Sequence, residues 1–519
     1  MSDEQIRDVF QNAEEWTPDN DDEEDSDGNV NGIGARLGPN SALPPLQLGS
    51  DVEIAGCVAQ LLRQERGEVV FSEGAFWYYA GSHWRKIDDH ELRLAVHRYD
   101  GSTIPGSSSR VKLGKTRVDS VLSEMTPMLA RPNFFDGASV GINCASGFIG
   151  FAPDGTPHLR PHDPGDRCRH VLKGSWTEGW LADEQTIFTS LESLDVLLAH
   201  LLDGVFLGDP DAKEKRQLLA EISGAAALGY GTKLLEPKAI ILEGKTAENG
   251  KSQVLDLFRG LLPPDAVASI PAAKMGDERF LVGLVGKHLN ASDELSGAEA
   301  IASEVFKAVV TGEFVTGRDV YRSAIPFRSV AQNVFATNTL PSFKGGMDRG
   351  VQRRLLVLTF NRTIPAEQRV ERIGQRISEE EADLLLAWAV AGASQLIRQR
   401  RFTVPPSSRT ALQEWLLSAD PVLAWMHTCV EVVDPKSPDW KTATIKSAHA
   451  YDAFNGWAKR EGFRENTLPA SNSFTGRLRA NRPSIAIKHA RDGNFLIGIK
   501  IVSSEGGPDV ADFFDERLR

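Results

Sequence analysis

The stretch AIILEGKTAENGKSQVLDLFRGLLP, residues 239–263, limits what this chain can fold into more than any other part of the sequence. An apolar run leads into a glycine-containing loop and then into an amphipathic run, which predicts a strand, a loop and a helix in that order. The GKS triplet at residues 250–252 matches the end of the phosphate-binding pattern G-x-x-x-x-G-K-[ST]. The first glycine of that pattern does not match, because Gly244 lies one position too early.

The loop nevertheless has the chemistry that phosphate binding needs. Backbone N–H groups at the N-terminus of a helix, together with the helix dipole, favour anions. Lys251 would place a positive charge on the β- and γ-phosphates of ATP, and the Ser252 hydroxyl would bind Mg²⁺. An ordinary strand-to-helix turn would leave the lysine at the start of the helix unexplained, so we predict a site for ATP and Mg²⁺.

Further β-prone runs predict an α/β core around this loop. Together with the first strand they lie at residues 238–243, 287–292, 332–337 and 355–360. A strand, a glycine loop, a helix and then further strands are the order of a nucleotide-binding α/β fold.

Polar residues follow two of these strands. Hydrolysis of a triphosphate needs a carboxylate for the metal and a group that activates water, and Asp293 and Glu294 offer both. The strand before them contains Asn290 and Ser292 and is poorly hydrophobic, so a solvated acidic turn is the alternative. Asn338 would orient the attacking water, or would be a turn residue.

Arginines precede the last strand of this core. Arg349, Arg353 and Arg354 lie just ahead of residues 355–360. They would neutralise charge on a transition state across a subunit boundary, or they would be ion-paired surface residues.

Three other segments predict secondary structure. Residues 76–88 predict two short strands, whose aromatic rings would form a small core rather than a stacking platform for bases. Residues 190–229 predict helices on both sides of a Gly-Asp-Pro break. Ser378 and Glu381 predict a capping box at the start of a helix that ends before Pro405.

The charge of the chain is unevenly distributed. Residues 1–36 contain twelve acids and two arginines, a balance of −10 within the net charge of −13. So polar a stretch buries little apolar surface, and we expect a disordered acidic tail and linker over residues 1–48. Since the rest of the chain carries only −3, the acidic balance does not exclude nucleic-acid binding.

Cysteine usage and hydropathy favour a soluble cytoplasmic protein with no membrane partner. The four cysteines contain no C-x-x-C pair, which argues for a reducing compartment. The first residues lack a basic, apolar leader, and no apolar stretch is long enough to span a bilayer. A metal site is not expected in the segment with the densest ligand residues, because their spacing fits no usual zinc pattern; these residues are His158, His162, Cys168 and His170.

A basic region lies near the end of the sequence. Residues 441–500 carry eleven Lys and Arg against four acids. Their pattern predicts two helices followed by a hairpin, and with the positive charge this favours a winged helix on duplex DNA. Arg477 and Arg479 are the candidate contacts, and a solvated basic face is the alternative.

The motifs together resemble those of the superfamily 3 helicases of the phage, plasmid and poxviral primase–helicase type. The resemblance lies in GKTAENGKS, LNASDEL, FKAVVTGEFVTGRDVYRSAIPF, FATNTLPSF and RGVQRRLLVLTFNRTIP. It implies an α/β multidomain fold, in which an AAA+-like P-loop ATPase core follows an α+β N-terminal helicase-associated region and precedes a C-terminal winged-helix domain. The implied boundaries are a tail at 1–48, the helicase-associated region at 49–189, a helical collar at 190–236, the ATPase at 237–365, a helical linker at 366–410 and the winged helix at 411–519.

The resemblance also implies roles for single residues. The nucleotide-binding set is Gly244, Asn249, Gly250, Lys251, Ser252 and Gln253, and the metal ligands are Ser252 and Asp293. The catalytic set is Glu294, Asn338, Arg353 and Arg354. In such relatives a hairpin in a central pore grips single-stranded DNA, and the matching residues here are Lys307, Arg318, Tyr321 and Arg322. For Lys307 a helix-surface lysine is an equal alternative.

We therefore predict an ATP-dependent DNA helicase, which the resemblance implies to be a hexameric ring that translocates on single-stranded DNA in phage or plasmid-type replication. Priming would be the work of a separate primase. An ATP-regulated initiator or clamp that binds DNA without translocation is the first alternative, favoured by the lengthened loop and the weakly hydrophobic second strand. A P-loop kinase is the second alternative, but it would leave the basic C-terminal region unused.

Overall fold

The structure is a computed structural model that describes residues 43–178, 196–244, 246–293, 299–318, 324–344, 346–463, 468–491 and 493–502. The chain divides into two units, Met1–Pro44 and Pro45–Arg519, and the fold below belongs to the second. Most of the predicted acidic tail, residues 1–42, lies outside the described residues.

Two antiparallel sheets and three helices form the first part of this unit. The aromatic segment is the predicted pair of strands, and its Trp84 is buried, with its ring 4.7 Å from that of Phe134. Trp84 therefore belongs to a small core, as predicted. The elements are α2 (Asp51–Arg66), β1 (Val69–Ser72), β2 (Ala75–Tyr79), β3 (Trp84–Lys86), α3 (Asp89–His97), α4 (Lys115–Leu129), β4 (Gly141–Cys144), β5 (Gly147–Phe151) and β6 (Pro157–Arg160).

The predicted α/β core is confirmed, and its sheet is parallel. Five strands pair in the order β15, β7, β13, β9 and β8, and every neighbouring pair runs parallel. Their side chains are almost all buried, as in a sheet covered on both faces. The strands are β7 (Ala239–Glu243), β8 (Val267–Ala268), β9 (Leu289–Ser292), β13 (Gln332–Thr337) and β15 (Leu355–Thr359).

Strand β9 is buried in spite of its polar residues. The Asn290 side chain accepts a hydrogen bond from the Ile270 backbone N–H at 2.8 Å and donates to the Ile270 carbonyl at 3.1 Å. It also donates to the Asn333 side chain at 3.1 Å. Because each polar atom has a partner, burial of this amide carries no large penalty.

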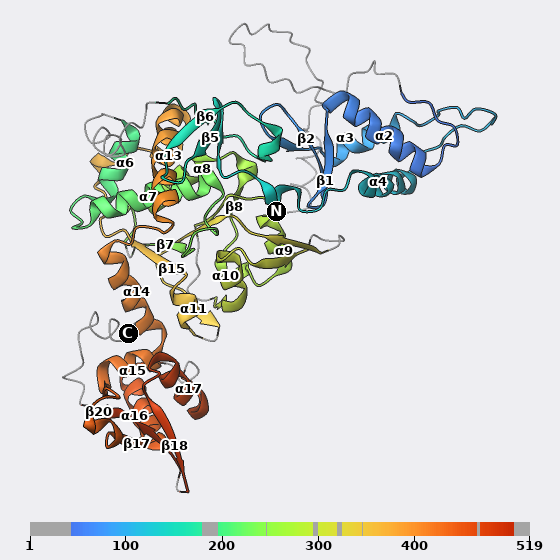
Figure 1. The fold of residues 1–519 in the computed structure, drawn as a ribbon. Helices are drawn as coiled ribbons and strands as arrows, with labels where there is room; N and C mark the ends of the chain where they lie inside the picture. Colours follow the sequence, from blue (N-terminus) through green and yellow to red (C-terminus); the bar gives the residue numbers. More distant parts are fainter. Residues whose placement is uncertain are drawn as a thin grey trace, which may run out of the picture. The chain divides into compact units, whose positions relative to one another are not determined.

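Helices α7 and α13 cross in close contact (Figure 1), and both contribute buried side chains to the hydrophobic core. A Cβ atom on Gly224 would lie 2.3 Å from the Ala393 backbone nitrogen, and one on Gly392 would lie 1.9 Å from the Ala220 carbonyl oxygen. The two helices approach this closely only because both positions are glycine. The helices of this layer are α6 (Leu197–Phe206), α7 (Ala212–Leu228), α8 (Lys251–Leu261), α12 (Ile373–Glu380) and α13 (Ala382–Gln399).

The predicted capping box of Ser378 and Glu381 is wrong. Ser378 lies inside α12, where its hydroxyl donates to the Gln375 carbonyl at 2.7 Å. Glu381 separates α12 from α13, and its carboxylate caps a different helix. It accepts hydrogen bonds from the first N–H groups of α6, those of Leu197 at 2.7 Å and Leu198 at 3.0 Å. A local sequence pattern does not reveal such a long-range cap.

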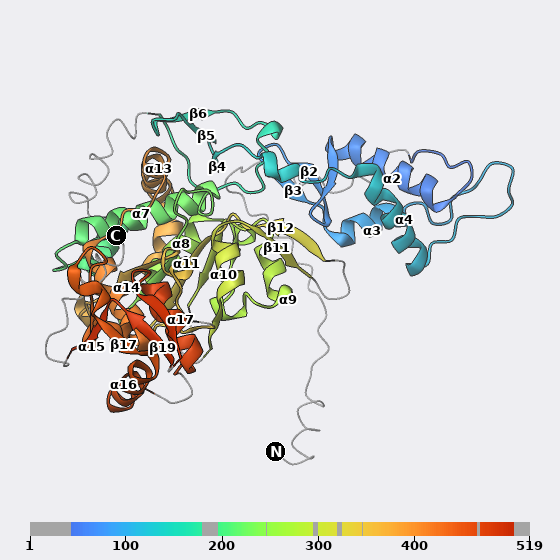
Figure 2. The ribbon, with the colours of Figure 1, turned by 60° about the horizontal axis from the view of Figure 1, so that its bottom comes forward.

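A hairpin projects beside the sheet, next to α9 and α10 (Figure 2). Its strands are β11 (Phe314–Gly317) and β12 (Ile325–Arg328), and residues 319–323 between them lie outside the described residues. The nearby elements are α9 (Glu278–Leu281), β10 (Ile301–Ala302), α10 (Ser303–Val310), β14 (Phe343–Lys344) and α11 (Arg349–Gln352).

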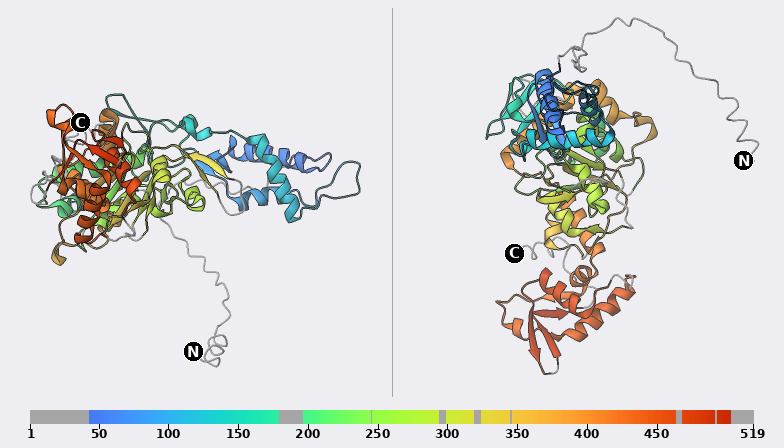
Figure 3. Two further views of the ribbon diagram at one scale, coloured as in Figure 1. Left: turned by 90° about the horizontal axis from the view of Figure 1, so that it is seen from below. Right: turned by 90° about the vertical axis from the view of Figure 1, so that its right-hand side faces the viewer.

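The C-terminal elements form a cluster of helices with small antiparallel sheets, coloured orange to red in Figure 3. The two predicted helices are α16 and α17, and the predicted hairpin is β18 and β19, which β17 extends to three strands. The elements are α14 (Pro406–Ala419), α15 (Pro421–Cys429), β16 (Val430–Val432), β17 (Thr444–Lys446), α16 (Ser447–Arg460), α17 (Ser471–Asn481), β18 (Ala486–Ala490), β19 (Gly493–Ile497) and β20 (Ile499–Ile501). Among the helices that the structure describes, none is long and apolar enough to cross a membrane.

Candidate functional site

The loop after β7 delivers Lys251 to the first position of α8. Gly250, which precedes the helix, has a φ of 86°, a backbone conformation that favours glycine. A Cβ atom there would also lie 2.4 Å from Cγ1 of Val205 in α6. Both observations explain why the position before the lysine is a glycine.

The ammonium group of Lys251 is buried among uncharged oxygens. Its Nζ donates to the Gly244 carbonyl at 2.9 Å, to Asn338 Oδ1 at 3.0 Å and to Asn249 Oδ1 at 3.2 Å. The residue is only 8% exposed, and burial lowers the pKa of the ammonium, which the charge of Glu243 partly offsets. None of the three acceptors carries a charge, so this cation is held in place by groups that do not neutralise it.

The early glycine of the loop has a defined role. A Cβ atom on Gly244 would lie 2.2 Å from Asn249 Nδ2 and 2.6 Å from Lys251 Nζ. The Asn249 amide donates to the Thr246 carbonyl at 2.6 Å and thereby holds the loop in its turn. Because Gly244 has no side chain, the Lys251 ammonium and the Asn249 amide can occupy the space next to it. The lysine can therefore keep this position although the loop is one residue longer than in the phosphate-binding pattern.

We expect Gly244→Ala to weaken the ATP binding that the sequence predicts, because the new methyl group displaces the Lys251 ammonium and the Asn249 amide. Loss of one well-placed charged hydrogen bond predicts an affinity about tenfold to 100-fold lower, measured by isothermal titration calorimetry. Gly56→Ala in α2 is the control, since a Cβ atom there meets no other atom within 4 Å. An unchanged affinity of the Gly244 variant would contradict this role of the glycine.

Most of the predicted nucleotide and metal residues line one pocket of about 320 Å³ at the carboxyl end of the sheet. Strand β13 lies between β7 and β9, so Asn338 at its end lies between the loop and Asp293. The predicted residues that line this pocket are Asn249, Gly250, Lys251, Ser252, Gln253, Asp293 and Asn338. Gly244 adjoins the pocket through its bond with Lys251, and Glu294 lies outside the described residues.

Asp293 is already engaged in an ion pair. Its Oδ2 accepts from Arg259 Nη2 at 2.7 Å, and half of its side chain is exposed. Ser252, the second residue of α8, is exposed in the same pocket. A hydroxyl and a carboxylate are hard oxygen donors, so this pair fits Mg²⁺.

The structure distinguishes the two candidate arginines. Arg354 Nη1 donates to the Gly350 carbonyl at 2.7 Å, and burial lowers the pKa of its guanidinium. The side chain of Arg353 is exposed and has no hydrogen bond or ion pair with any residue that the structure describes. Of these two arginines, Arg353 is therefore the one whose guanidinium is available to another molecule. Arg349, the first residue of α11, lies on the same groove as Arg353.

The candidate DNA contacts fall into different environments. Lys307 Nζ binds two carboxylates, Glu304 at 2.8 Å and Asp348 at 3.3 Å, which favours the structural alternative for this lysine. Arg318 is exposed at the end of β11. Tyr321 and Arg322 lie outside the described residues.

The hairpin carries an exposed pair that the sequence did not reveal. Phe314 is 61% exposed and faces Arg328 across the two strands, with the guanidinium carbon 4.2 Å from the ring centroid. Strand alternation puts Thr316 and Arg318 on the same face as Phe314. The register of the hairpin shows that Phe314 and Arg328 are cross-strand neighbours, and the sequence alone does not determine this register.

The two basic candidates of α17 differ in exposure. Arg479 is exposed, whereas Arg477 is half-buried, with Nη1 3.9 Å from Asp420 Oδ1. Arg479 is therefore the better candidate for a contact with DNA.

The histidines for which no metal site was expected have protein partners. In the first part of the unit, His162 bonds to Asn143 Oδ1 at 2.9 Å and His170 to the Gly286 carbonyl at 2.9 Å. Within the described ranges no three metal-ligating side chains gather at one point.

Fold and site together define an α/β protein with a parallel sheet and a buried lysine at a glycine loop. A family model described as "Family of unknown function (DUF5906)" matches residues 242–354, which include this loop, β9 and β13. No curated protein matches the chain. Solved structures that resemble it include "The A form apo structure of NrS-1 C terminal region-CTR", at 12% identity and a TM-score of 0.40, over 86% of this chain and 99% of that one. A second, "The A form apo structure of NrS-1 C terminal region-CTR(305-718)", is also 12% identical, with a TM-score of 0.41, over 88% of this chain and 100% of that one.

Proposed function

We propose that this protein is an ATP-dependent DNA helicase, whose AAA+-like core hydrolyses ATP in the pocket beside Lys251. The observation that supports it most is the buried ammonium held by three neutral oxygens at the start of α8. A cation placed in this way has no counter-ion among its hydrogen-bond partners, and phosphate oxygens would supply one. The helix N-terminus adds favourable potential at the same point.

The other residues of the pocket fit hydrolysis of the γ-phosphate by water. Ser252 and Asp293 would hold Mg²⁺, which when bound neutralises charge on the phosphates. The Asn338 amide lies within hydrogen-bond distance of Lys251 and would orient the attacking water. Glu294, one residue beyond Asp293, would accept the proton of that water. The guanidinium of Arg353 would act in the site of a neighbouring subunit, as expected for a hexameric ring.

DNA would bind at two surfaces. The exposed face of the β11–β12 hairpin offers a phenylalanine ring and two guanidinium groups, which suit the bases and phosphates of a single strand. Arg479 on α17 and the neighbouring hairpin suit a winged helix on duplex DNA.

The test of this proposal is ATP turnover with and without single-stranded DNA. A helicase requires stimulation by the strand, and we expect turnover to rise at least about tenfold at saturating DNA, with Mg²⁺ present. Strand separation on a forked duplex is then measured directly. A protein that binds neither ATP nor DNA would refute the proposal.

One observation favours the ATP-regulated initiator as a second candidate. Asp293 Oδ2 pairs with Arg259 at 2.7 Å, so the guanidinium competes with a metal for the charge of this carboxylate. A site that binds ATP and hydrolyses it slowly would act as a switch for DNA binding. ATP-dependent DNA affinity without strand-stimulated turnover would favour the initiator over the helicase.

Phe314→Ala is expected to lower the affinity for single-stranded DNA by about tenfold, because stacking of a base on an aromatic ring contributes about 1–3 kcal/mol. Fluorescence anisotropy with a labelled oligonucleotide measures it. Since the ring is largely exposed, the melting temperature should not change. Leu94→Ala, which removes an exposed apolar side chain from α3, is the control. Unchanged DNA affinity would remove the hairpin face from the proposed DNA path.

A further inference from the structure

The loop between α3 and α4 is an ordered hairpin, which we call the basic hairpin and define as residues 101–113. Its two arms are joined by backbone hydrogen bonds. The Gly101 N–H donates to the Val111 carbonyl at 2.8 Å, and the Val111 N–H donates to the Ser102 carbonyl at 3.0 Å. The basic hairpin projects past α2 and α4, away from the parallel sheet (Figures 1 and 2).

The second arm of the basic hairpin is anchored to its surroundings. Arg117 of α4 donates to the Lys112 carbonyl at 3.2 Å and pairs with Asp51, the first residue of α2, at 2.7 Å. The Asp100 carboxylate accepts a hydrogen bond from the Leu113 N–H at 2.8 Å. These contacts fix the backbone of the arm that carries the basic side chains.

Positive charge is concentrated in and beside this hairpin. Residues 98–117 contain five Lys and Arg and one acid, Asp100, whereas the rest of residues 45–135 contains six Lys and Arg and ten acids. Two of the five cations are paired, Arg98 with Glu65 and Arg117 with Asp51. The positive excess therefore belongs to the three other cations of the segment.

These three cations, Arg110, Lys112 and Lys115, are exposed. Arg110 and Lys112 lie on either side of Val111, which is only 2% exposed, so their side chains share the outer face of the hairpin. Lys115 is the first residue of α4, where the helix dipole disfavours a cation and the first turn contains no acid. None of the three side chains has an ion pair or hydrogen bond with any residue that the structure describes.

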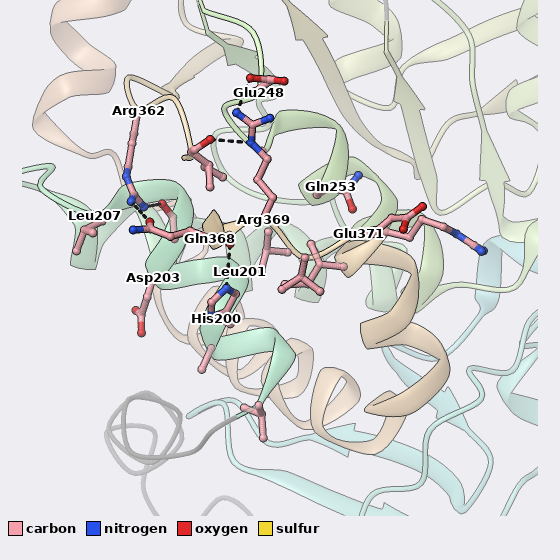
Figure 4. Close-up of a pocket in the computed structure, with 18 residues that line it drawn as sticks. His200, Leu201, Asp203, Leu207, Glu248, Gln253, Arg362, Gln368, Arg369 and Glu371 are labelled. Atoms are coloured by element: carbon pink, nitrogen blue, oxygen red, sulfur yellow. Dashed lines mark hydrogen bonds and ion pairs between the residues drawn. The ribbon is translucent and has the colours of Figure 1, made fainter. Parts of the chain in front are cut away.

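Two arginines in the cavity beside the glycine loop provide a contrast (Figure 4). Arg369 pairs with Glu248 at 2.5 Å, and Arg362 donates to the Gly204 carbonyl. Both guanidinium groups are therefore engaged within the chain, whereas the cations of the basic hairpin are open to another molecule.

We propose that the basic hairpin and the start of α4 bind the phosphate backbone of duplex DNA without reading its sequence. Lys and Arg side chains together with serine hydroxyls are typical contacts of DNA phosphates. The tip of the hairpin, residues 105–109, is exposed and consists of a proline, a glycine and three serines. It offers no aromatic ring for stacking on single-stranded bases and no large apolar side chain for insertion into lipid. The surface lies on other elements than the two DNA surfaces proposed above, and it requires no ATP.

Neutralising the three cations tests this proposal. We expect the triple variant Arg110→Gln, Lys112→Gln and Lys115→Gln to bind a labelled DNA duplex at least about tenfold more weakly at about 0.1 M salt. The slope of log affinity against log salt concentration should become shallower by about 2–3, since each phosphate contact contributes about 0.9. Fluorescence anisotropy on the full chain without ATP measures both, so the result does not depend on ATP hydrolysis. The melting temperature should not change, because the three side chains are exposed.

The matched control removes the same charges elsewhere. It is the triple variant Arg85→Gln, Lys86→Gln and Lys173→Gln, which changes exposed residues of β3 and of the segment after β6. Its duplex affinity should fall by less than about twofold, with an unchanged salt slope, because distant surface charges are screened by salt. An equal loss in both triple variants, or an unchanged affinity of the hairpin variant, would overturn the proposal. If the hairpin variant instead lost binding to phosphatidylserine vesicles and kept its duplex affinity, the surface would be a membrane contact and the proposal would be wrong.

Discussion

Lys251→Ala should weaken ATP binding by about 100-fold or more, the largest effect on ATP affinity that we expect from a single substitution. The phosphates would lose the buried ammonium of Lys251, while the N–H groups at the start of α8 would remain. The same change leaves three acceptors without their donor, namely the Gly244 carbonyl and the side-chain oxygens of Asn249 and Asn338. A modest fall in melting temperature should therefore accompany the loss of binding.

Lys274→Ala is the control for this experiment. Lys274 is a partly exposed lysine paired with Glu299 at 3.1 Å, so its removal also costs one positive charge but does not touch the loop. ATP affinity and turnover should be those of the wild type. A Lys251→Ala protein that still bound and hydrolysed ATP at nearly the wild-type rate would show that the loop is an ordinary turn.

The core of this fold could be predicted because its signals are local. The run of apolar residues before the loop, the amphipathic run after it and the separate β-prone segments each define an element without knowledge of the rest of the chain. The strands that form agree with these segments to within two residues. Lys251 and Asn338 could be paired in the same way, because both follow strands whose carboxyl ends meet at one edge of the sheet.

Features that depend on distant contacts could not be predicted. Glu381 caps α6, which lies more than 180 residues earlier in the chain, so its capping role has no local pattern. The need for glycine at position 244 comes from the lysine seven residues later, which folds back onto it. Phe314 and Arg328 meet only after the hairpin has its register. Each of these required the tertiary structure.

Burial also distinguishes two arginines, Arg353 and Arg354, to which the sequence assigns the same candidate role. Arg353 and Arg354 are neighbours in a basic run, and nothing in that run says which one is available for another molecule. The turn after α11 directs Arg354 back to the Gly350 carbonyl and leaves Arg353 exposed on an open groove between β15 and α14. The choice of Arg353 as the catalytic candidate therefore depends on where the four-residue helix α11 ends, because that end sets the direction of the next two side chains.

Arg353→Ala should lower ATP turnover by about 10³-fold and leave ATP binding nearly unchanged, because an arginine that acts in trans stabilises charge that develops only in the transition state. Arg354→Ala should instead lower the melting temperature, since the Gly350 carbonyl loses its donor and a half-buried side chain is removed. Steady-state kinetics, a direct binding measurement and a thermal melt on both variants separate the two roles. Equal loss of turnover without loss of stability in both variants would contradict this division.

Mixing subunits tests whether Arg353 acts in a neighbouring site. Arg353→Ala subunits keep an intact loop, and Lys251→Ala subunits keep an intact arginine, but neither protein alone has an interface with both. In mixed rings some interfaces combine the loop of one parent with the arginine of the other, so part of the activity should return. In a monomer, or where the arginine serves its own subunit, every site keeps one defect and mixing restores nothing. If native mass spectrometry shows mixed rings and turnover stays at the level of the separate variants, the site does not span two subunits.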